Sequence, residues 1–374
     1  MQKATTTELK RTNTNNVLQF IYHQRKTSQQ EIANSLQLSR PTISQILKEL
    51  ESLKLIEKNG FFESTGGRKA DAITFVSSGK IALGLEILQN SYEIVAINLY
   101  GDIIKSQITE RPFTNDEPYY AEIGAAVNRF VDTLHISSRR ILGLGIVLQG
   151  VISFDGTKVT YGKILNCTGL TVDRFKRYIH HPCSMIHDAE AAATGELWAD
   201  PSIKDAIFFH IRTNLSGALI VDGKFLKGNE LKSGVFEHMA IVPNGRPCYC
   251  GKRGCVDAYC SLNALLPNEE SIDSFFRNLR KGSVEYRWRW NEYLKYLSTS
   301  INNLHMVIDY DIILGGTLAK YLTSEDIDEL HHLIEEKTAF PSKRRFIKIS
   351  SCGHMPIAKG AALPYVAHYM DSVL

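Results

Sequence analysis

The sequence predicts an α/β protein made of a small, basic, helical N-terminal domain and a larger domain in which strands alternate with helices. With 374 residues, the chain exceeds one ordinary single-core domain and suits two or three. Its 44% hydrophobic and 22% charged residues are typical of a soluble globular protein. The charge is unevenly divided, because residues 1–70 carry a net +5 and residues 71–374 a net −2. The basic end is therefore the candidate nucleic-acid surface.

Nothing in the sequence indicates export or a membrane. The chain has no opening apolar segment after a basic start and no run of eighteen apolar residues, so neither a signal peptide nor a membrane span is predicted. The seven cysteines are odd in number and clustered, which fits metal binding in a reducing compartment better than a disulfide framework. We expect a cytoplasmic protein with no membrane partner.

Three helices are predicted in the N-terminal domain. Residues 1–14 are polar and are expected to form a flexible arm, and a helical apolar pattern starts at Asn15. The capping box of residues 28–31, SQQE, opens a second short helix. Ser39 caps a third helix, in which Pro41 is tolerated in the first turn. The predicted buried side of the third helix consists of Ile43, Ile46, Leu47, Leu50 and Leu53.

The second and third helices, joined by residues 37–39, form a helix-turn-helix pattern. The start of the third helix would enter a major groove, where Arg and Gln can each make two hydrogen bonds to a base edge. The candidate base contacts are Arg40, Thr42, Ser44 and Gln45. Lys48 is better placed for a phosphate, which fixes register without reading sequence. The alternative is a small helical protein-interaction domain.

A wing is predicted after the third helix. Residues 55–62, LIEKNGFF, indicate a strand, an Asn-Gly turn and a second strand. Residues 64–69, STGGRK, follow, and their glycines would let Arg68 and Lys69 lie along phosphates or in a minor groove; the alternative is a plain linker. The predicted domains are a winged helix-turn-helix over 1–63, a linker over 64–79 and a larger domain over 80–374.

A zinc site is predicted in residues 238–260. His238, Cys248, Cys250 and Cys255 have the spacing H-x9-C-x-C-x4-C. One imidazole and three thiolates complete the tetrahedral shell of Zn2+, and a shell closed by four protein ligands is structural rather than hydrolytic. The alternative is a set of ordinary free cysteines, but three of the chain's seven lie within eight residues.

With its flanks, this stretch resembles the signature of the ROK family of bacterial sugar kinases and sugar-responsive repressors. Residues 234–261 read GVFEHMAIVPNGRPCYCGKRGCVDAYCS, and the family pattern is GEIGH followed by CxCGxxGCLE. The segment STGGRK is similar to the SxGGRRP segment of ROK repressors. The resemblance implies an actin-like ATPase fold, in which two lobes of related topology close around a sugar. The residues themselves predict three consecutive strands over 80–87, 92–99 and 103–109.

The phosphate loops implied by the resemblance are altered. At the place of the family's DxGGT turn the chain has residues 86–91, EILQNS, without either glycine. The second turn, GTGIGGG in the family, is RTNLSGA over residues 212–218 and keeps one glycine. Residues 315–317, GGT, survive, but a strand-to-helix turn explains them without a nucleotide. Because backbone N–H groups must approach the phosphates closely, we expect ATP binding to be lost.

The implied sugar pocket is partly kept. Residues 186–191, IHDAEA, match the family's ENDANA, so that Asp188 falls on the kinases' general base; the alternative is a carboxylate that merely favours a helix N-terminus. The sugar-contacting glutamate of GEIGH is Val235, which cannot accept a hydrogen bond. Glu190 or Glu237 could replace it. The predicted effector-binding residues are Asp188, Glu190, His238 and Asp257, the last standing at the glutamate of GCLE.

The sequence as a whole therefore predicts a ROK-type transcriptional regulator and not an enzyme. A homodimer or homotetramer would bind operator DNA as a repressor, controlled by a sugar or sugar derivative in a catalytically inactive kinase-like domain that holds structural Zn2+. One alternative is a sugar kinase with a DNA-binding appendage. Another is a regulator controlled by a protein partner.

Overall fold

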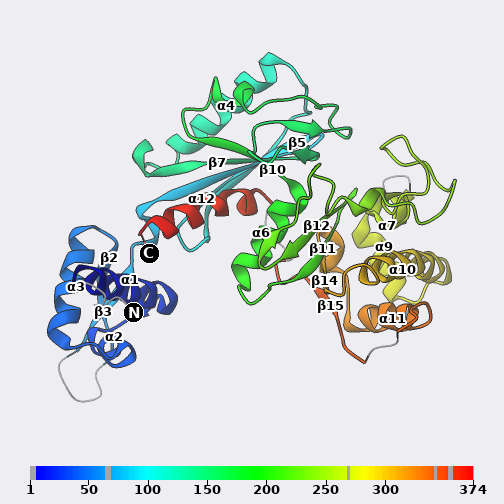
Figure 1. The fold of residues 1–374 in the computed structure, drawn as a ribbon. Coiled ribbons are helices and arrows are strands. Elements are labelled where there is room, and N and C mark those ends of the chain that lie inside the picture. The colour runs from blue at the N-terminus through cyan, green and yellow to red at the C-terminus, as the bar shows by residue number, and fades with distance from the viewer. Residues whose placement is uncertain (1–5, 64–68, 268–269, 341–342, 353–356, 374) are drawn as a thin grey trace.

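The computed structural model describes residues 6–63, 69–267, 270–340, 343–352 and 357–373. Figure 1 shows three units: a small N-terminal domain and two larger lobes, each built on its own sheet. Within the described ranges, no helix is long and apolar enough to cross a lipid bilayer.

The N-terminal domain packs three helices against a small sheet. The elements are α1 (Thr6–Gln24), β1 (Lys26–Thr27), α2 (Gln29–Leu36), α3 (Arg40–Ser52), β2 (Ile56–Phe61) and β3 (Asp71–Phe75). Ser28 and Ser39 cap α2 and α3 as predicted, since each side chain accepts a hydrogen bond from the backbone three residues on. The shared core holds Val17, Leu18, Ile21, Ile32, Ile43, Ile46 and Leu50, all fully buried.

Several predictions for this domain need correction. Helix α1 begins at Thr6 rather than Asn15, so the polar stretch before Asn15 is helical from that residue on. Strand β2 runs through Asn59 and Gly60, because the positive φ of Gly60 (82°) serves a register shift rather than a hairpin turn. The wing is instead the antiparallel pair β2–β3, and the predicted linker 64–79 therefore contains a strand of the domain. Leu53, predicted to be buried, is 61% exposed.

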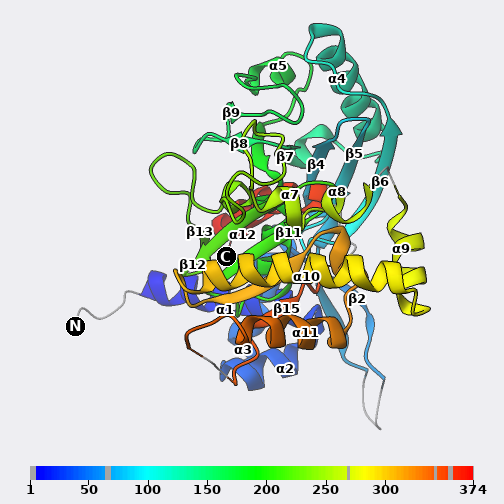
Figure 2. The same ribbon diagram turned by 90° about the vertical axis from the view of Figure 1, so that its right-hand side faces the viewer.

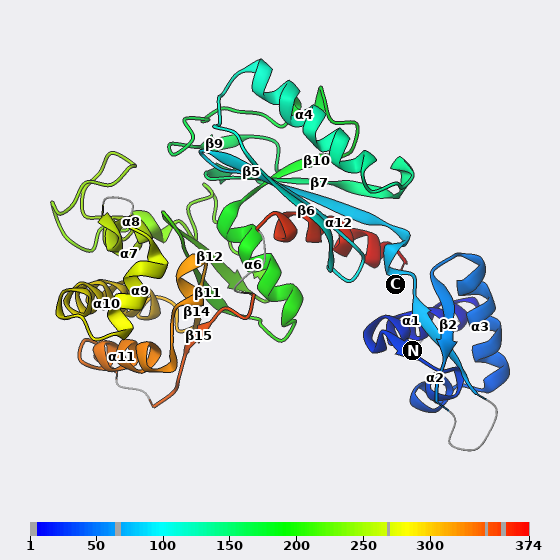
Figure 3. The same cartoon turned by 180° about the vertical axis from the view of Figure 1, so that it is seen from behind.

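The first lobe contains a five-stranded sheet in the order β10-β7-β4-β5-β6. The strands are β4 (Ile81–Ile87), β5 (Ser91–Ile97), β6 (Ile103–Glu110), β7 (Ile141–Leu148) and β10 (Cys183–His187). The predicted three-stranded meander is confirmed, with β4, β5 and β6 antiparallel, while β4, β7 and β10 are parallel. Helix α4 (Glu117–Asp132) covers one face, and a short ribbon, β8 (Val151–Ile152) with β9 (Val159–Tyr161), precedes α5 (Asp173–Lys176) (Figure 3).

The second lobe repeats this topology. Its sheet has the order β13-β12-β11-β14-β15, again with three antiparallel strands followed by two parallel ones. The strands are β11 (Ala206–Ile211), β12 (Leu215–Val221), β13 (Lys224–Phe225), β14 (Asp311–Gly315) and β15 (Ile347–Ile349). One face is covered by α7 (Asp257–Cys260), α8 (Leu262–Leu265), α9 (Ile272–Arg280), α10 (Val284–His305) and α11 (Ser324–Glu335), with α10 crossing the view in Figure 2. The two related lobes implied by the resemblance are thus present.

Helices α6 (Asp188–Ala199) and α12 (Ile357–Val373) join the lobes. Helix α12 lies on the first sheet so closely that a Cβ on Gly84 would come within 1.7 Å of Ala358 O. At its crossing with α6, a Cβ on Gly360 would come within 1.8 Å of Ala191 O. Helix α6 in turn packs Ala189 on the second sheet (Figure 1). Glycine at these crossings therefore lets the two helices form one tightly packed joint.

Candidate functional site

The candidate DNA-binding surface is the start of α3. Arg40, Gln45 and Lys48 are exposed there, while Thr42 and Ser44 are half-buried. The Thr42 hydroxyl lies 2.8 Å from Ser39 Oγ, so part of its hydrogen-bonding capacity is already used inside the domain. Of the two predicted cations of residues 64–69, Lys69 lies between β2 and β3 of the wing and is exposed, whereas Arg68 lies outside the described residues.

The four predicted metal ligands converge. The ligand atoms of His238, Cys248, Cys250 and Cys255 all lie within 4.8 Å of one another. Cys248 Sγ is 3.7 Å from His238 Nδ1, and Cys250 Sγ is 3.7 Å from Cys255 Sγ. A tetrahedral ion with bonds of about 2.3 Å to sulfur and about 2.0 Å to nitrogen holds its ligand atoms roughly 3.5–3.8 Å apart. The donor set and its spacing therefore fit a tetrahedral metal ion.

Local backbone geometry brings these side chains together. His238 ends the short helix η3 (Phe236–His238), and the cysteines lie on turns joined by the bridges Ala240–Cys255 and Pro247–Arg253. Gly254 has a φ of 83°, and a Cβ there would lie 1.8 Å from Val242 O. Only glycine fits this turn, which aims Cys255 inward.

The candidate effector cavity lies between the lobes beside the metal site. Its lining residues are Gln149, Gly150, Val151, Tyr161, Lys163, Ile164, His187, Asp188, Asn214, Leu215, Ser216, Val235, Glu237, His238 and Tyr249. The cavity holds about 30 Å³, which is room for water molecules but not for a sugar ring. The lobes or lining side chains must therefore move apart before a sugar can enter.

Asp188 lies at the first position of α6 and is buried in this cavity wall. Its Oδ1 accepts a hydrogen bond from Ala189 N at 2.9 Å and lies 3.1 Å from His187 Nε2. Burial alone would raise the pKa of Asp188, but its electrostatic contacts with His187 and the Arg212 guanidinium lower it. The guanidinium is the permanent charge among these, so the carboxylate is held ionised as a hydrogen-bond acceptor.

The other acidic candidates differ in where they point. Glu237 lines the cavity, is only 3% exposed, and its Oε2 has no hydrogen-bond partner among the described residues. Burial raises the pKa of Glu237 well above its usual value. Glu190 instead pairs with Lys227 Nζ at 2.8 Å and lines a neighbouring cavity. Asp257 Oδ1 accepts a hydrogen bond from Leu215 N at 2.8 Å and also lies outside the effector cavity.

The structure thus brings Asp188 and His238 together at the cavity and leaves Glu190 and Asp257 just outside it. Sequence reasoning missed Tyr249, which lies between two metal ligands and lines the cavity. Its position inside the C-x-C pair was a usable signal, because a residue between two candidate ligands must lie at the candidate site.

An ion pair joins the lobes in the region of the altered phosphate loops, and it lines a cavity of about 260 Å³ there. Arg212 at the end of β11 places Nη1 2.5 Å from Glu86 Oε1 on β4. Gly217, the one glycine kept in the second turn, is required because a Cβ there would lie 2.3 Å from the Phe236 ring. Gly316 has a φ of 80°, and its Cβ would meet the backbone of Ile211 at 2.5 Å. Both glycines are therefore explained by packing.

Two known protein families match separate parts of the chain, one the two lobes and the other the N-terminal domain. Residues 82–362 match the model of the ROK family, and residues 15–60 match that of the MarR family. The chain belongs to the ROK family. It is 21% identical to the xylose repressor of Caldicellulosiruptor bescii over 89% of either chain. It is 22% identical to the dual regulator NagC of Escherichia coli over 63% of this chain and 59% of NagC.

Solved structures show the same fold. A ROK family transcriptional regulator, a homologue of the E. coli MLC protein, aligns over 98% of both chains with a TM-score of 0.74 and 20% identity. A ROK family glucokinase from Streptomyces griseus, in complex with glucose and AMPPNP, aligns over 76% of this chain with a TM-score of 0.66 and 20% identity. The family and fold predicted from the sequence are confirmed, and the relatives that match most of the chain favour a regulator over a kinase.

Proposed function

We propose that the protein is a transcriptional repressor that binds operator DNA through its N-terminal domain and releases it when a sugar or sugar derivative enters the interlobe cavity. The observation that carries this proposal is a helix-turn-helix joined to a ROK domain whose phosphate loops lack most of the family's glycines. Repressors among the relatives, named for xylose and N-acetylglucosamine, support it. We propose a cytoplasmic location, where a repressor would meet its operator DNA.

DNA recognition would use the exposed start of α3. Arg40 and Gln45 would read base edges, with Thr42 and Ser44 adding shorter contacts. Lys48 would hold phosphates, and Arg68 with Lys69 would follow the backbone or minor groove beside the wing. A homodimer would present two α3 helices to a palindromic operator, and a homotetramer would present two such pairs.

The metal ion would be structural zinc. Held by His238, Cys248, Cys250 and Cys255, it would crosslink a segment with little regular secondary structure of its own. That segment also carries Glu237 and Tyr249 into the cavity wall. We infer that the ion keeps the wall in shape when the cavity opens and closes.

Effector recognition would centre on two buried carboxyl groups. Asp188 would accept a hydrogen bond from an effector hydroxyl, and Glu237 would supply the hydrogen-bonding group that Val235 lacks. The unpartnered Oε2 of Glu237 supports this assignment over Glu190, whose carboxylate is engaged by Lys227. Asp257 would act indirectly, because it fixes the backbone at Leu215 in the cavity wall.

The test is fluorescence anisotropy of the zinc-replete protein on the DNA upstream of its own gene, at fixed salt because phosphate contacts make affinity depend on ionic strength. The titration is repeated with pentoses, hexoses, amino sugars and their phosphates. Specific binding that one sugar weakens is the expected result. Binding unchanged by every sugar would favour control by a protein partner. No specific binding, there or on a random operator library, together with sugar-dependent ATP turnover, would favour the kinase alternative.

A further inference from the structure

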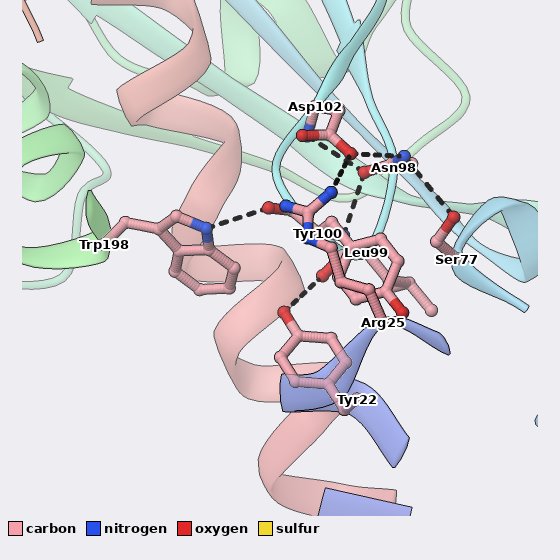
Figure 4. Close-up of polar contacts among 8 residues, drawn as sticks. All are labelled: Tyr22, Arg25, Ser77, Asn98, Leu99, Tyr100, Asp102 and Trp198. Atoms are coloured by element: carbon pink, nitrogen blue, oxygen red, sulfur yellow. Dashed lines mark hydrogen bonds and ion pairs between the residues drawn. The ribbon is translucent and has the colours of Figure 1, made fainter. Parts of the chain in front are cut away.

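Helix α6 connects the effector cavity to the N-terminal domain. Its first residue, Asp188, lines the cavity, and Trp198 lies in its last turn, about 15 Å further along the helix axis. Trp198 Nε1 donates a hydrogen bond to Tyr100 O at 3.0 Å, in the loop of residues 98–102 between β5 and β6 (Figure 4). One end of a single rigid helix thus lies at the effector cavity and the other at this loop.

The 98–102 loop is held in one conformation. Asn98 Oδ1 accepts hydrogen bonds from Tyr100 N and Asp102 N, both at 2.9 Å. Gly101 has a φ of 77°, and a Cβ there would lie 2.8 Å from Trp198 Nε1. A side chain at position 101 would push the indole away, so the loop and the end of α6 fit each other closely.

The opposite side of the same loop holds the N-terminal domain. Tyr22 of α1 donates its hydroxyl hydrogen bond to Leu99 O at 2.8 Å. Just after α1, the Arg25 guanidinium lies 4.5 Å from the centre of the Tyr100 ring and 3.4 Å from Asp102 Oδ2. Successive carbonyls of the loop, Leu99 and Tyr100, therefore accept hydrogen bonds from the DNA-binding domain and from α6 respectively (Figure 4).

The chain that enters the first lobe is fastened to this loop as well. Leu99 N donates to Ser77 O at 2.9 Å, and Asn98 Nδ2 lies 3.5 Å from Ser77 Oγ. Arg25 and Asp102 are largely exposed, with 61% and 52% of their side-chain surfaces accessible. Exposed ion pairs stabilise weakly, and the domain is also held by a hydrophobic cluster that it shares with the first lobe, to which Tyr22, Leu99 and Tyr100 contribute.

We propose that α6 and the 98–102 loop transmit occupancy of the effector cavity to the DNA-binding domain. The inference rests on the proposed function. An effector hydroxyl bound by Asp188 acts on the N-terminal end of α6, and any displacement along this rigid helix moves Trp198 against Tyr100. Because Tyr22 and Arg25 dock on the same five-residue loop, that displacement changes the placement of α3 relative to a second copy.

The experiment uses the full-length protein and two single-group deletions, Trp198→Phe and Tyr22→Phe. Each removes one hydrogen-bond donor to the loop and keeps an aromatic ring. Tyr100→Phe is the matched control, because the Tyr100 hydroxyl has no hydrogen-bond partner among the described residues. Operator affinity is measured by anisotropy without and with xylose, glucose, N-acetylglucosamine and their phosphates. Sugar binding is measured separately by calorimetry.

Wild type and Tyr100→Phe are expected to show the same fold-change in operator affinity on addition of the active sugar. Trp198→Phe and Tyr22→Phe are expected to keep their sugar affinity and sugar-free operator affinity within about threefold while that fold-change drops at least fivefold, which corresponds to the usual size of a coupling between sites. A full sugar response in both variants would overturn the relay alone. A wild-type protein whose operator binding no sugar alters would overturn the proposed function, and the relay with it.

Discussion

Arg212 Nη1 lies 2.5 Å from Glu86 Oε1, and this ion pair joins the second lobe to the first across the interlobe cleft. Burial raises the pKa of Glu86, and the Arg212 guanidinium opposes that rise. The pair occupies the region where a ROK kinase would bring glycine-rich turns to the phosphates. The pair leaves a cavity of about 260 Å³ there, and the Glu86 side chain stands at the place of the first glycine-rich turn.

Removing one partner of this pair should destabilise the protein. Arg212→Met leaves the Glu86 carboxylate buried without a counter-charge, and we expect a loss of about 3 kcal/mol in the free energy of unfolding. The double substitution Glu86→Leu with Arg212→Met should recover most of that loss, because it leaves no buried charge. Urea denaturation of wild type, both single variants and the double variant measures the coupling. Additive losses would show that the pair contributes nothing across the cleft.

Base reading and phosphate contact by α3 should be separable. Arg40→Ala is expected to cost about 1–3 kcal/mol of operator binding and to relax the preference at one base pair. Lys48→Ala should weaken binding to all DNA sequences alike and reduce the slope of log affinity against log salt concentration by about one. Anisotropy on the operator and on single-base variants, over a range of salt, distinguishes the two. An equal effect of both substitutions on every sequence would remove Arg40 from the base-reading set.

Zinc binding should depend on the cysteines of the candidate metal site and not on the nearby Cys260. Cys250→Ala should lose bound zinc and lower the melting temperature, because it removes one of four ligands. Cys260→Ala is the matched control, since its thiol lies 3.6 Å from Ser300 Oγ and outside the ligand cluster. Zinc per chain, measured by atomic emission, should be one in wild type and in the control. Full zinc content in Cys250→Ala would contradict the assignment.

Effector binding should depend on Glu237 more than on Glu190. Glu237→Ala removes a buried hydrogen-bonding group from the cavity wall and should weaken binding of the active sugar by about 1–3 kcal/mol, or roughly 5–150-fold. Glu190→Gln is the control, because that carboxylate pairs with Lys227 outside the cavity. Calorimetry gives the affinities, and zinc content is checked in parallel because His238 is adjacent. A larger loss from the control would identify Glu190 as the replacement for Val235.

The elements of regular structure were predictable because their signals are local. Alternation of apolar residues located β4, β5 and β6, and the side chains of Ser28 and Ser39 marked two helix starts. The Asn59-Gly60 turn was mispredicted because glycine with positive φ serves a hairpin or a register shift equally well. Only the pairing of β2 with β3, several residues further on, decides between them.

The direction of a functional side chain was much less predictable. Spacing was enough for the candidate metal ligands, whose ligand atoms all lie within 4.8 Å of one another. Glu190 and Glu237 were equivalent in the sequence, and they separate only because Lys227, distant in the sequence, engages one and leaves the other unpartnered. Asp257 likewise turns toward Leu215 N, a contact between distant segments that no local pattern encodes.

His210 should make the stability of the protein depend on pH. It lies on β11 with Asp188, Arg212, His187 and Ser216 around it, and burial lowers its pKa from 6.5 to about 3. The imidazole is therefore neutral when folded, and an unfolded chain binds a proton more readily. Because the pKa of His210 is lower in the folded protein than in the unfolded chain, the group contributes stability at pH values above the unfolded pKa. This stability is lost as the pH falls from 6.5 toward 3.

As the pH falls from 7.5 to 5.5, His210 binds a proton in the unfolded chain but not in the folded protein. This difference should lower the free energy of unfolding of wild type by about 1.4 kcal/mol, because one extra proton on the unfolded chain corresponds to about 1.36 kcal/mol per pH unit. His210→Asn removes the titrating group and should flatten that part of the curve. His332→Asn is the control for the loss of an imidazole, because His332 is an exposed residue on α11. Urea denaturation at four pH values measures the difference in unfolding free energy between wild type and His210→Asn. Any pH dependence that comes from the candidate metal site is common to both proteins and cancels in this difference. An identical slope in wild type and His210→Asn would mean that the buried imidazole is already protonated in the folded state.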